Sequence, residues 1–128
     1  MKRKLKTTAI LTVGGITIAR FLAAQRRKFE VAGKSVLITG GSRGLGMEIA
    51  RQLINEGAKQ IAICARDDVE LEHAKAELEN RGAQILALQC DVRDKSQIEK
   101  TVARVQQKFG VIDVLINNAG VIQIAPVE

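Results

Sequence analysis

The sequence predicts an α/β protein built on a doubly wound, parallel sheet of about four strands. Short apolar runs rich in β-branched residues alternate with longer segments in which apolar residues recur every three or four positions. A short run without polar residues suits a strand that is buried on both faces, as in a parallel sheet. Regular alternation of strand and helix gives parallel strands, right-handed crossovers and helices on both faces.

Residues 35–55 are expected to form the first strand, a turn and the first helix. The strand is centred on Val36–Ile38, and four glycines follow it within seven residues: Gly40, Gly41, Gly44 and Gly46. Apolar residues at every fourth position predict a helix whose inner stripe is Leu45, Ile49 and Leu53. Gly57 is placed where that helix would end.

A glycine turn between a strand and a helix is suited to binding phosphate. Glycine lets the backbone turn sharply and lets a phosphate approach the main chain, while the following helix offers unpaired N–H groups. We therefore expect the loop Gly40–Gly46 to hold a pyrophosphate. Ser42 can donate a hydrogen bond there, and Leu45 is expected to direct its N–H to phosphate and its side chain inward. A tight turn without a ligand is the alternative.

The rest of the chain continues the alternation. Strands are predicted at Gln60–Cys64, Gln84–Gln89 and Val111–Ile116. A helix capped by Asp67 or Asp68 is expected to run to about Arg81, with its inner stripe at Leu71, Ala74 and Leu78 and its end at Gly82. The next helix is expected to be capped by Asp94 and ended by Gly110, with its inner stripe at Ile98, Val102, Val105 and Phe109.

Three motifs, each at the end of a predicted strand, resemble those of the short-chain dehydrogenase/reductase family. They are Thr39–Gly46, the pair Asp91-Val92 and the run Asn117–Gly120, and the resemblance extends from about Lys34 to the end of the sequence. It implies a Rossmann-like domain that binds a nicotinamide dinucleotide. The family's chemistry is hydride transfer between the nicotinamide ring and a carbonyl or alcohol carbon.

The resemblance also implies roles for the second and third motifs. The Asp91 carboxylate would accept a hydrogen bond from the adenine amino group, and the Val92 backbone would complete that contact. Asn118, Ala119 and Gly120 would line the side of the site near the nicotinamide ribose. Asn117 is expected to have a structural role, because asparagines at this position tie the central strands together through side-chain-to-backbone bonds.

Two arginines predict a preference for NADP(H) over NAD(H). Arg66 follows the second predicted strand, where a carboxylate would bind both ribose hydroxyls of the cofactor that lacks the 2′-phosphate. An arginine offers a planar fork matched to phosphate, and Arg43 in the glycine loop can approach the same phosphate. Asp67 or Asp68 can instead face the ribose, which would favour NAD(H).

No catalytic residue is predicted in this sequence. The family uses a serine and a Tyr-x-x-x-Lys pair that follow the asparagine motif, and this sequence contains no tyrosine. We therefore interpret residues 34–128 as the N-terminal part of an NAD(P)-binding domain, with an incomplete sheet, from an oxidoreductase acting on a small alcohol or ketone. That parent protein can be oligomeric. The alternative is a non-catalytic NADP(H)-binding or membrane-tethered interaction module.

Residues 1–30 form a separate basic and apolar segment that is expected to be helical. Residues 1–34 carry nine Lys and Arg and one acidic residue, whereas the remaining sequence has eleven basic and thirteen acidic residues. This distribution argues against a nucleic-acid-binding domain, which would spread basic residues over a folded face. Residues 5–28 can associate with a membrane surface, act as a secretory signal or pack as a helical extension, on an otherwise cytoplasmic protein.

The two cysteines, Cys64 and Cys90, fit no metal-binding spacing. Each follows an apolar run, so both are expected near strand ends as reduced, buried or half-buried thiols. A disulfide between them is conceivable if their strands are neighbours. His73 lies within a predicted helix and is expected to be exposed to solvent.

Overall fold

A computed structural model of the chain describes residues 29–120. The chain divides into two units, Met1–Glu30 and Val31–Glu128, and the description below concerns the second. Its elements alternate in the order β1 (Ser35–Thr39), α2 (Gly44–Asn55), β2 (Gln60–Ala65), α3 (Asp68–Asn80), β3 (Gln84–Gln89), α4 (Lys95–Phe109) and β4 (Val114–Asn117). The predicted order of strands and helices is therefore confirmed.

The four strands form one parallel sheet in the order β3-β2-β1-β4. Strand β1 lies inside the sheet, where Ile38 is aligned with Ile63 of β2 and Ile116 of β4. Chain order is reversed between β1 and β4, because β2 and β3 lie on one side of β1 and β4 on the other. In open α/β sheets, ligands bind outside the carboxyl ends of the strands at such a switch point.

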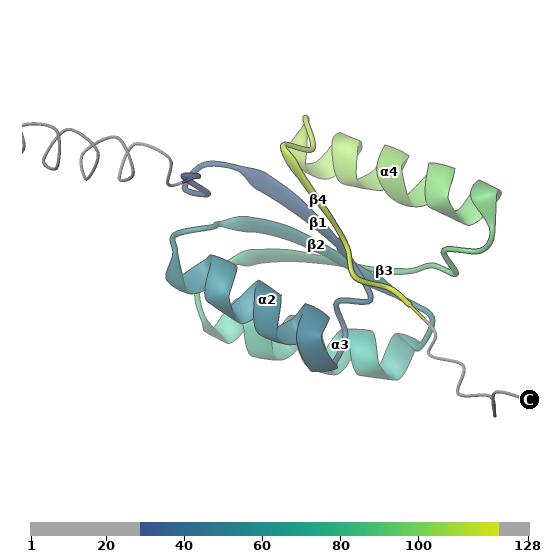
Figure 1. The fold of residues 1–128 in the computed structure, drawn as a ribbon, viewed down its shortest axis with the longest axis horizontal. Helices are drawn as coiled ribbons and strands as arrows, with labels where there is room; N and C mark the ends of the chain where they lie inside the picture. Colours follow the sequence, from purple (N-terminus) through teal and green to yellow (C-terminus); the bar gives the residue numbers. More distant parts are fainter. Residues whose placement is uncertain (1–28, 121–128) are drawn as a thin grey trace, which may run out of the picture. The chain divides into compact units, whose positions relative to one another are not determined.

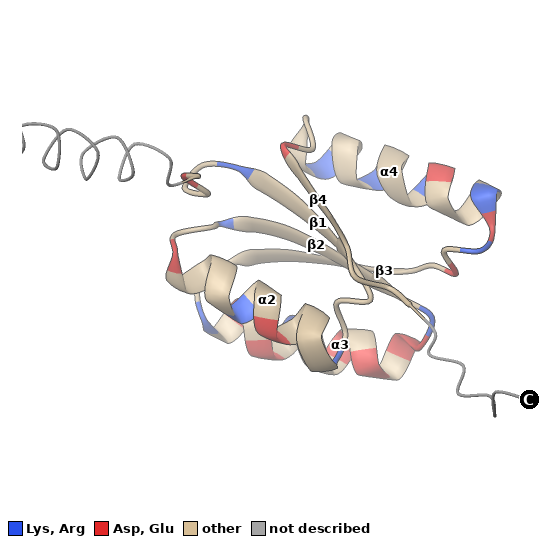
Figure 2. Ribbon diagram, viewed as in Figure 1, with Lys and Arg blue, Asp and Glu red and all other residues tan. Residues whose placement is uncertain are grey.

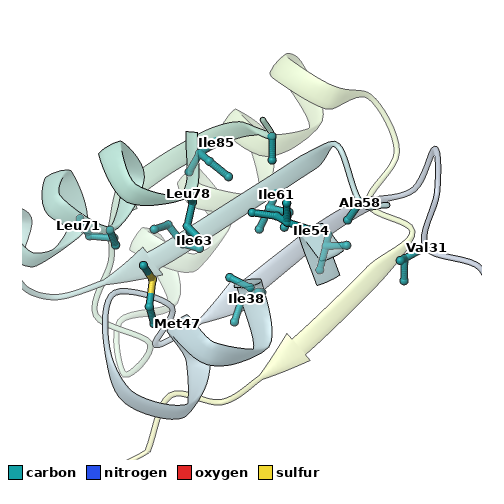
Figure 3. Packing of buried hydrophobic residues seen from close by; sticks show 14 residues of the cluster. Val31, Ile38, Met47, Ile54, Ala58, Ile61, Ile63, Leu71, Leu78 and Ile85 are labelled. Carbon is teal, nitrogen blue, oxygen red and sulfur yellow. The ribbon is translucent and has the colours of Figure 1, made fainter. Parts of the chain in front are cut away.

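Helices α2 and α3 cover one face of the sheet and α4 covers the other (Figure 1). The face below α2 and α3 holds the larger apolar core, in which Ile38, Ile61 and Ile63 pack with Met47 and Leu78 (Figure 3). An ion pair between Arg51 Nε and Glu77 Oε1, at 2.7 Å, joins the outer sides of these two helices. Their packing positions the start of each helix relative to the strand ends.

The face below α4 has a smaller core. Val105 of α4 packs with Leu37 and Ala62 of the sheet, and partly buried apolar residues surround these three. The predicted inner stripe of α4 is confirmed for Val102, Val105 and Phe109, but Ile98 in the first turn is exposed. The packed part of α4 therefore runs from Thr101 to Phe109.

The helix caps agree with the sequence predictions. The Asp67 side chain accepts a hydrogen bond from Glu70 N, and the Asp94 side chain accepts from Ser96 N and Gln97 N. The buried residues of α3 are the predicted Leu71, Ala74 and Leu78. Gly110 is the C-cap of α4, with a φ of 83° that suits glycine.

The predicted position of Leu45 is wrong. Leu45 is 68% exposed, whereas the buried face of α2 is formed by Gly46, Met47, Ala50 and Ile54. Successive helical residues are about 100° apart, so Leu45 lies about 180° around the axis from Ile54. Apolar residues at every fourth position thus did not show which side of the helix faces the core at its first turn.

The fourth strand begins three residues later than predicted, at Val114. The preceding residues form a loop that is held by Ser35: the Ser35 hydroxyl donates to Val111 O, and Ser35 N donates to Asp113 Oδ2 at 2.9 Å. The Ser35 hydroxyl thus occupies the Val111 carbonyl, which a strand would direct into the sheet ladder. Strand β2 extends one residue further than predicted, to Ala65.

The predicted helix and membrane association of residues 5–28 lie outside the described residues. Among residues 29–120, no helix has both the length and the apolar character needed to cross a membrane.

Candidate functional site

A cavity of about 930 Å³ opens at the carboxyl ends of the strands. It is bordered by the glycine loop after β1, the segment after β2, the segment after β3 and the residues after β4. All of the predicted site residues except Gly46 line it: Gly40, Ser42, Arg43, Gly44, Leu45, Arg66, Asp91, Val92, Asn118, Ala119 and Gly120. The structure therefore brings three motifs that are distant in sequence to one place.

The conformation of the loop explains its glycines. Gly40 and Gly44 have φ angles of 68° and 56°, in the region that side chains disfavour. A Cβ at Gly41 would lie 2.7 Å from Ile63 Cγ2, and a Cβ at Gly46 would lie on the Gly40 carbonyl oxygen. Gly46 is thus needed for the close approach of α2 to the loop, although it does not itself line the cavity.

The start of α2 is suited to an anion. Arg43 is the N-cap residue, its side chain makes no capping hydrogen bond, and the first turn of α2 contains no acidic residue. The first backbone bond of the helix runs from Met47 N to Arg43 O, so the preceding N–H groups have no partner within the helix. These groups and the positive end of the helix dipole lie at the cavity.

The residues after β4 are attached to the glycine loop by side-chain hydrogen bonds. Asn118 Nδ2 donates to Gly40 O at 3.0 Å, and Thr39 Oγ1 accepts from Asn118 N and Ala119 N. The structural role predicted for Asn117 is instead carried by Asn118, whose side chain makes the bond to the backbone. Asn117 is exposed at the end of β4. Asn118 both lines the cavity and holds the glycine loop in place through its bond to Gly40.

Three arginines and three carboxylates line the cavity near the ends of β2 and β3. The arginines are Arg43, Arg66 and Arg93, and the carboxylates are Asp67, Glu70 and Asp91. Arg66 is exposed, and none of the salt bridges found among residues 29–120 includes it. The Arg66 guanidinium is thus a cation without a salt-bridge partner in the described part of the chain.

Asp91 is held by Arg93. The Arg93 guanidinium donates from Nε and Nη2 to both carboxylate oxygens, and Arg93 N donates to Asp91 Oδ1 at 3.0 Å. These bonds hold the pKa of Asp91 well below its usual range. The carboxylate is therefore ionised at neutral pH and can accept hydrogen bonds.

Cys64 and Cys90 are free, buried thiols at the base of the cavity, as expected for reduced cysteines. Burial, reinforced by the neighbouring Cys90 thiol, raises the pKa of Cys64 to about 12. The Cys64 thiol is consequently protonated at neutral pH and poorly nucleophilic. Among residues 29–120, no group of three His, Cys, Asp or Glu residues could hold a metal ion.

The sequence model of the short chain dehydrogenase family matches residues 34–128. The chain belongs to this family. Oxidoreductase UcpA of Salmonella typhimurium is 42% identical over 92 residues, which cover 72% of this chain and 34% of UcpA. The chain spans about a third of the length of UcpA and of two ketoacyl reductases that it also matches.

Two solved structures have a similar fold over the matched part of their chains. NAD+-bound xylitol dehydrogenase is 34% identical, with a TM-score of 0.69 over 73% of this chain and 35% of that one. A blue fluorescent protein from a metagenomic library, in complex with NADPH, is 34% identical, with a TM-score of 0.70 over 77% of this chain and 41% of that one. Similarity to the two is nearly equal, so it does not distinguish the two cofactors.

Sequence reasoning missed two charged residues that line the cavity. Glu70 lies three residues after the N-cap Asp67, and the first turn of α3 faces the ends of the strands. Arg93 lies two residues after Asp91, within reach of its side chain. In both cases, the available signal was a charged residue two or three positions after an aspartate that follows a predicted strand.

Proposed function

We propose that this chain binds NADP(H) as the cofactor-binding part of a short-chain oxidoreductase. The observation that supports NADP(H) is the placement of Arg43 and Arg66, from different segments, on one cavity at the end of β2. Each charge-assisted bond from a guanidinium to the 2′-phosphate would contribute about 1.5–3 kcal/mol. Two such bonds would outweigh the ribose contacts that NAD(H) makes in their place.

The rest of the cavity fits the proposed cofactor. The free N–H groups at the start of α2 and the positive-φ glycines form a cradle for the pyrophosphate. Asp91 would accept from the adenine amino group, while Ala119 and Gly120 leave room beside the nicotinamide ribose. When bound, the nicotinamide ring would donate or accept the hydride. The residues of this chain bind and orient the dinucleotide.

The carboxylates that would favour NAD(H) have other positions or partners. Asp67 Oδ1 accepts from Glu70 N at 2.9 Å, as the cap of α3. Asp68 is exposed in the first turn of α3 and does not line the cavity. These placements support Arg66, rather than either aspartate, as the residue that meets the 2′ position of the ribose.

Calorimetric titration of the 128-residue chain with NADP+ and NAD+ tests the proposal. We expect tighter binding of NADP+, by roughly tenfold or more, given the strength of charge-assisted bonds. In the Arg66→Ala variant, the affinity for NADP+ should fall towards that for NAD+. Equal affinities for the two cofactors in the unmodified chain would remove the preference, and absence of binding to both would overturn the proposal.

We propose hydride transfer to or from a small alcohol or ketone as the activity of the whole protein. The sequence contains no tyrosine, so the acid/base residue implied by family resemblance must come from sequence outside these 128 residues. Reading the coding DNA beyond Glu128 tests this. An open frame that encodes a serine and Tyr-x-x-x-Lys supports the oxidoreductase, and an immediate stop codon contradicts it.

We also propose that residues 5–28 bring this protein to a membrane surface. The support is the sequence itself, in which an apolar run lies between two clusters of basic residues. A soluble reporter fused to residues 1–34 should sediment with the membrane fraction of cells. A reporter found wholly in the supernatant would end this proposal, which is independent of cofactor binding.

A further inference from the structure

We propose that Glu70 is a specificity-determining residue that competes with the cofactor 2′-phosphate for Arg43. This inference rests on the proposed binding of NADP(H) and deepens it. Both carboxylate oxygens of Glu70 are engaged by residues of the glycine loop: Oε1 is 3.2 Å from Arg43 Nη1, and Oε2 accepts from Ser42 Oγ at 3.1 Å. The carboxylate therefore contacts the side chains expected to bind cofactor oxygens.

Glu70 differs from the other two carboxylates of the cavity in the partners it uses. Asp67 caps α3, and Asp91 is held by Arg93 and lies where the adenine is expected. Glu70 alone among these three contacts residues of the proposed phosphate cradle. Figure 2 shows the acidic residues at the end of α3 that faces the carboxyl ends of the strands.

The Glu70–Arg43 pair is placed so that a ligand can separate it. The side chain of Arg43 is 78% exposed and that of Glu70 is 36% exposed, and such pairs gain little net energy in water. A phosphate dianion carries more charge than a carboxylate, so it can replace Glu70 as the partner of the Arg43 guanidinium. A cofactor without the 2′-phosphate offers Arg43 no such partner, so the pair with Glu70 can persist.

Glu70 is expected to affect the binding of NADP(H) and NAD(H) to different extents. In the chain as it stands, binding of NADP(H) requires the loss of one ion pair and places a carboxylate near the new phosphate. Binding of NAD(H) requires neither. Glu70 thus weakens the affinity for NADP(H) more than that for NAD(H). It therefore reduces the preference for NADP(H) that Arg43 and Arg66 create.

The test compares two neutralising substitutions on the same helix in the full 128-residue chain. Glu70→Gln keeps an oxygen that can accept from Ser42 but removes the charge that pairs with Arg43. Glu72→Gln removes the same charge from an exposed residue that does not line the cavity. Calorimetric dissociation constants for NADP+ and NAD+ are measured for both variants and for the unmodified chain.

Glu70→Gln should tighten NADP+ binding about threefold to tenfold, as expected for removal of a nearby like charge and a weak competing pair, and should change NAD+ binding less than twofold. Glu72→Gln should leave the ratio of the two constants unchanged. In an Arg43→Ala background, the effect of Glu70→Gln on NADP+ should become smaller, because only the repulsion between the Glu70 carboxylate and the phosphate remains. An unchanged ratio in Glu70→Gln, or an equal shift in Glu72→Gln, would overturn the role of Glu70.

These outcomes are separable from failure of the proposed function. If the unmodified chain binds both cofactors equally and Glu70→Gln creates a preference for NADP+, the role of Glu70 is supported while the stated preference of the chain is wrong. If neither protein binds a dinucleotide, both proposals fall. Circular dichroism of each variant confirms that the fold is kept, and Glu70→Ser provides a second neutral side chain if Glu70→Gln does not fold.

Discussion

The Thr39 hydroxyl oxygen accepts a hydrogen bond from the backbone N–H of Asn118 at 3.1 Å, across a sequence separation of 79 residues. The same oxygen accepts from Ala119 N at 3.0 Å. One side chain at the end of β1 thereby satisfies two backbone donors of the segment after β4. This joins the end of β1, where the glycine loop begins, to the segment after β4 that lines the cavity, so the shape of the site depends on it.

Replacement of Thr39 by valine should destabilise the protein. Valine has nearly the shape of threonine but cannot accept, so two backbone N–H groups lose their partner. We expect a loss of about 1–3 kcal/mol in the free energy of unfolding, measured by urea denaturation. Thr39→Ser retains the hydroxyl oxygen, so its free energy of unfolding should fall clearly less than that of the valine variant. Equal stability of the valine variant and the unmodified chain would contradict this assignment.

Replacement of Gly46 by alanine should disturb the loop even though Gly46 does not line the cavity. The added Cβ would lie on the Gly40 carbonyl oxygen and 2.5 Å from Asn118 Nδ2, so backbone must move. Overpacking of this kind costs about 1–3 kcal/mol, measurable as a lower urea midpoint. Gly120→Ala is the control for stability, because a Cβ there meets no atom within 4 Å. An unchanged midpoint in Gly46→Ala would show that the loop can relax.

The sequence was sufficient to predict the elements and the location of the site. Apolar runs and glycines recur with the periods of buried strands and of helices, and these periods are local properties of the chain. Because the strands are parallel, motifs at their ends meet at one edge of the sheet, which is why Asp91 and Asn118 could be placed beside the glycine loop in advance. Asp67 and Asp94 were recognisable as caps for the same local reason.

The sequence was not sufficient to predict which partners the charged side chains choose. The contact of Glu70 with Ser42 and Arg43 depends on how α3 packs beside α2, and the two segments are 27 or 28 residues apart. The exposure of Leu45 depends on the rotation of α2 about its axis, which the core sets through Met47 and Ile54. Such features follow from tertiary packing and not from local periodicity.

Asp91→Asn and Arg66→Ala should affect the two cofactors differently. The proposed contact of Asp91 is with adenine, which NAD+ and NADP+ share, so Asp91→Asn should weaken both to a similar extent, by roughly tenfold for the loss of a charge-assisted bond. Arg66→Ala should weaken the binding of NADP+ and leave that of NAD+ unchanged. Calorimetry gives the ratio of the dissociation constants for NADP+ and NAD+ in each variant. A selective loss of NADP+ binding in Asp91→Asn would show that Asp91 does not contact the shared part of the cofactor.

The raised pKa of Cys64 should make the protein less stable at alkaline pH. The Cys64 thiol ionises near its ordinary pKa of 9.0 in the unfolded chain but only at about 12 in the folded one. Between these values, the unfolded state binds fewer protons, so the free energy of unfolding should fall as pH rises, by at most about 1.4 kcal/mol per pH unit. Urea denaturation between pH 7 and 10.5 measures the slope. Cys64→Ala should be less stable at pH 7, because it leaves a cavity, but its stability should decline less steeply above pH 9. Equal slopes for the two proteins would mean that Cys64 ionises as readily when folded as when unfolded.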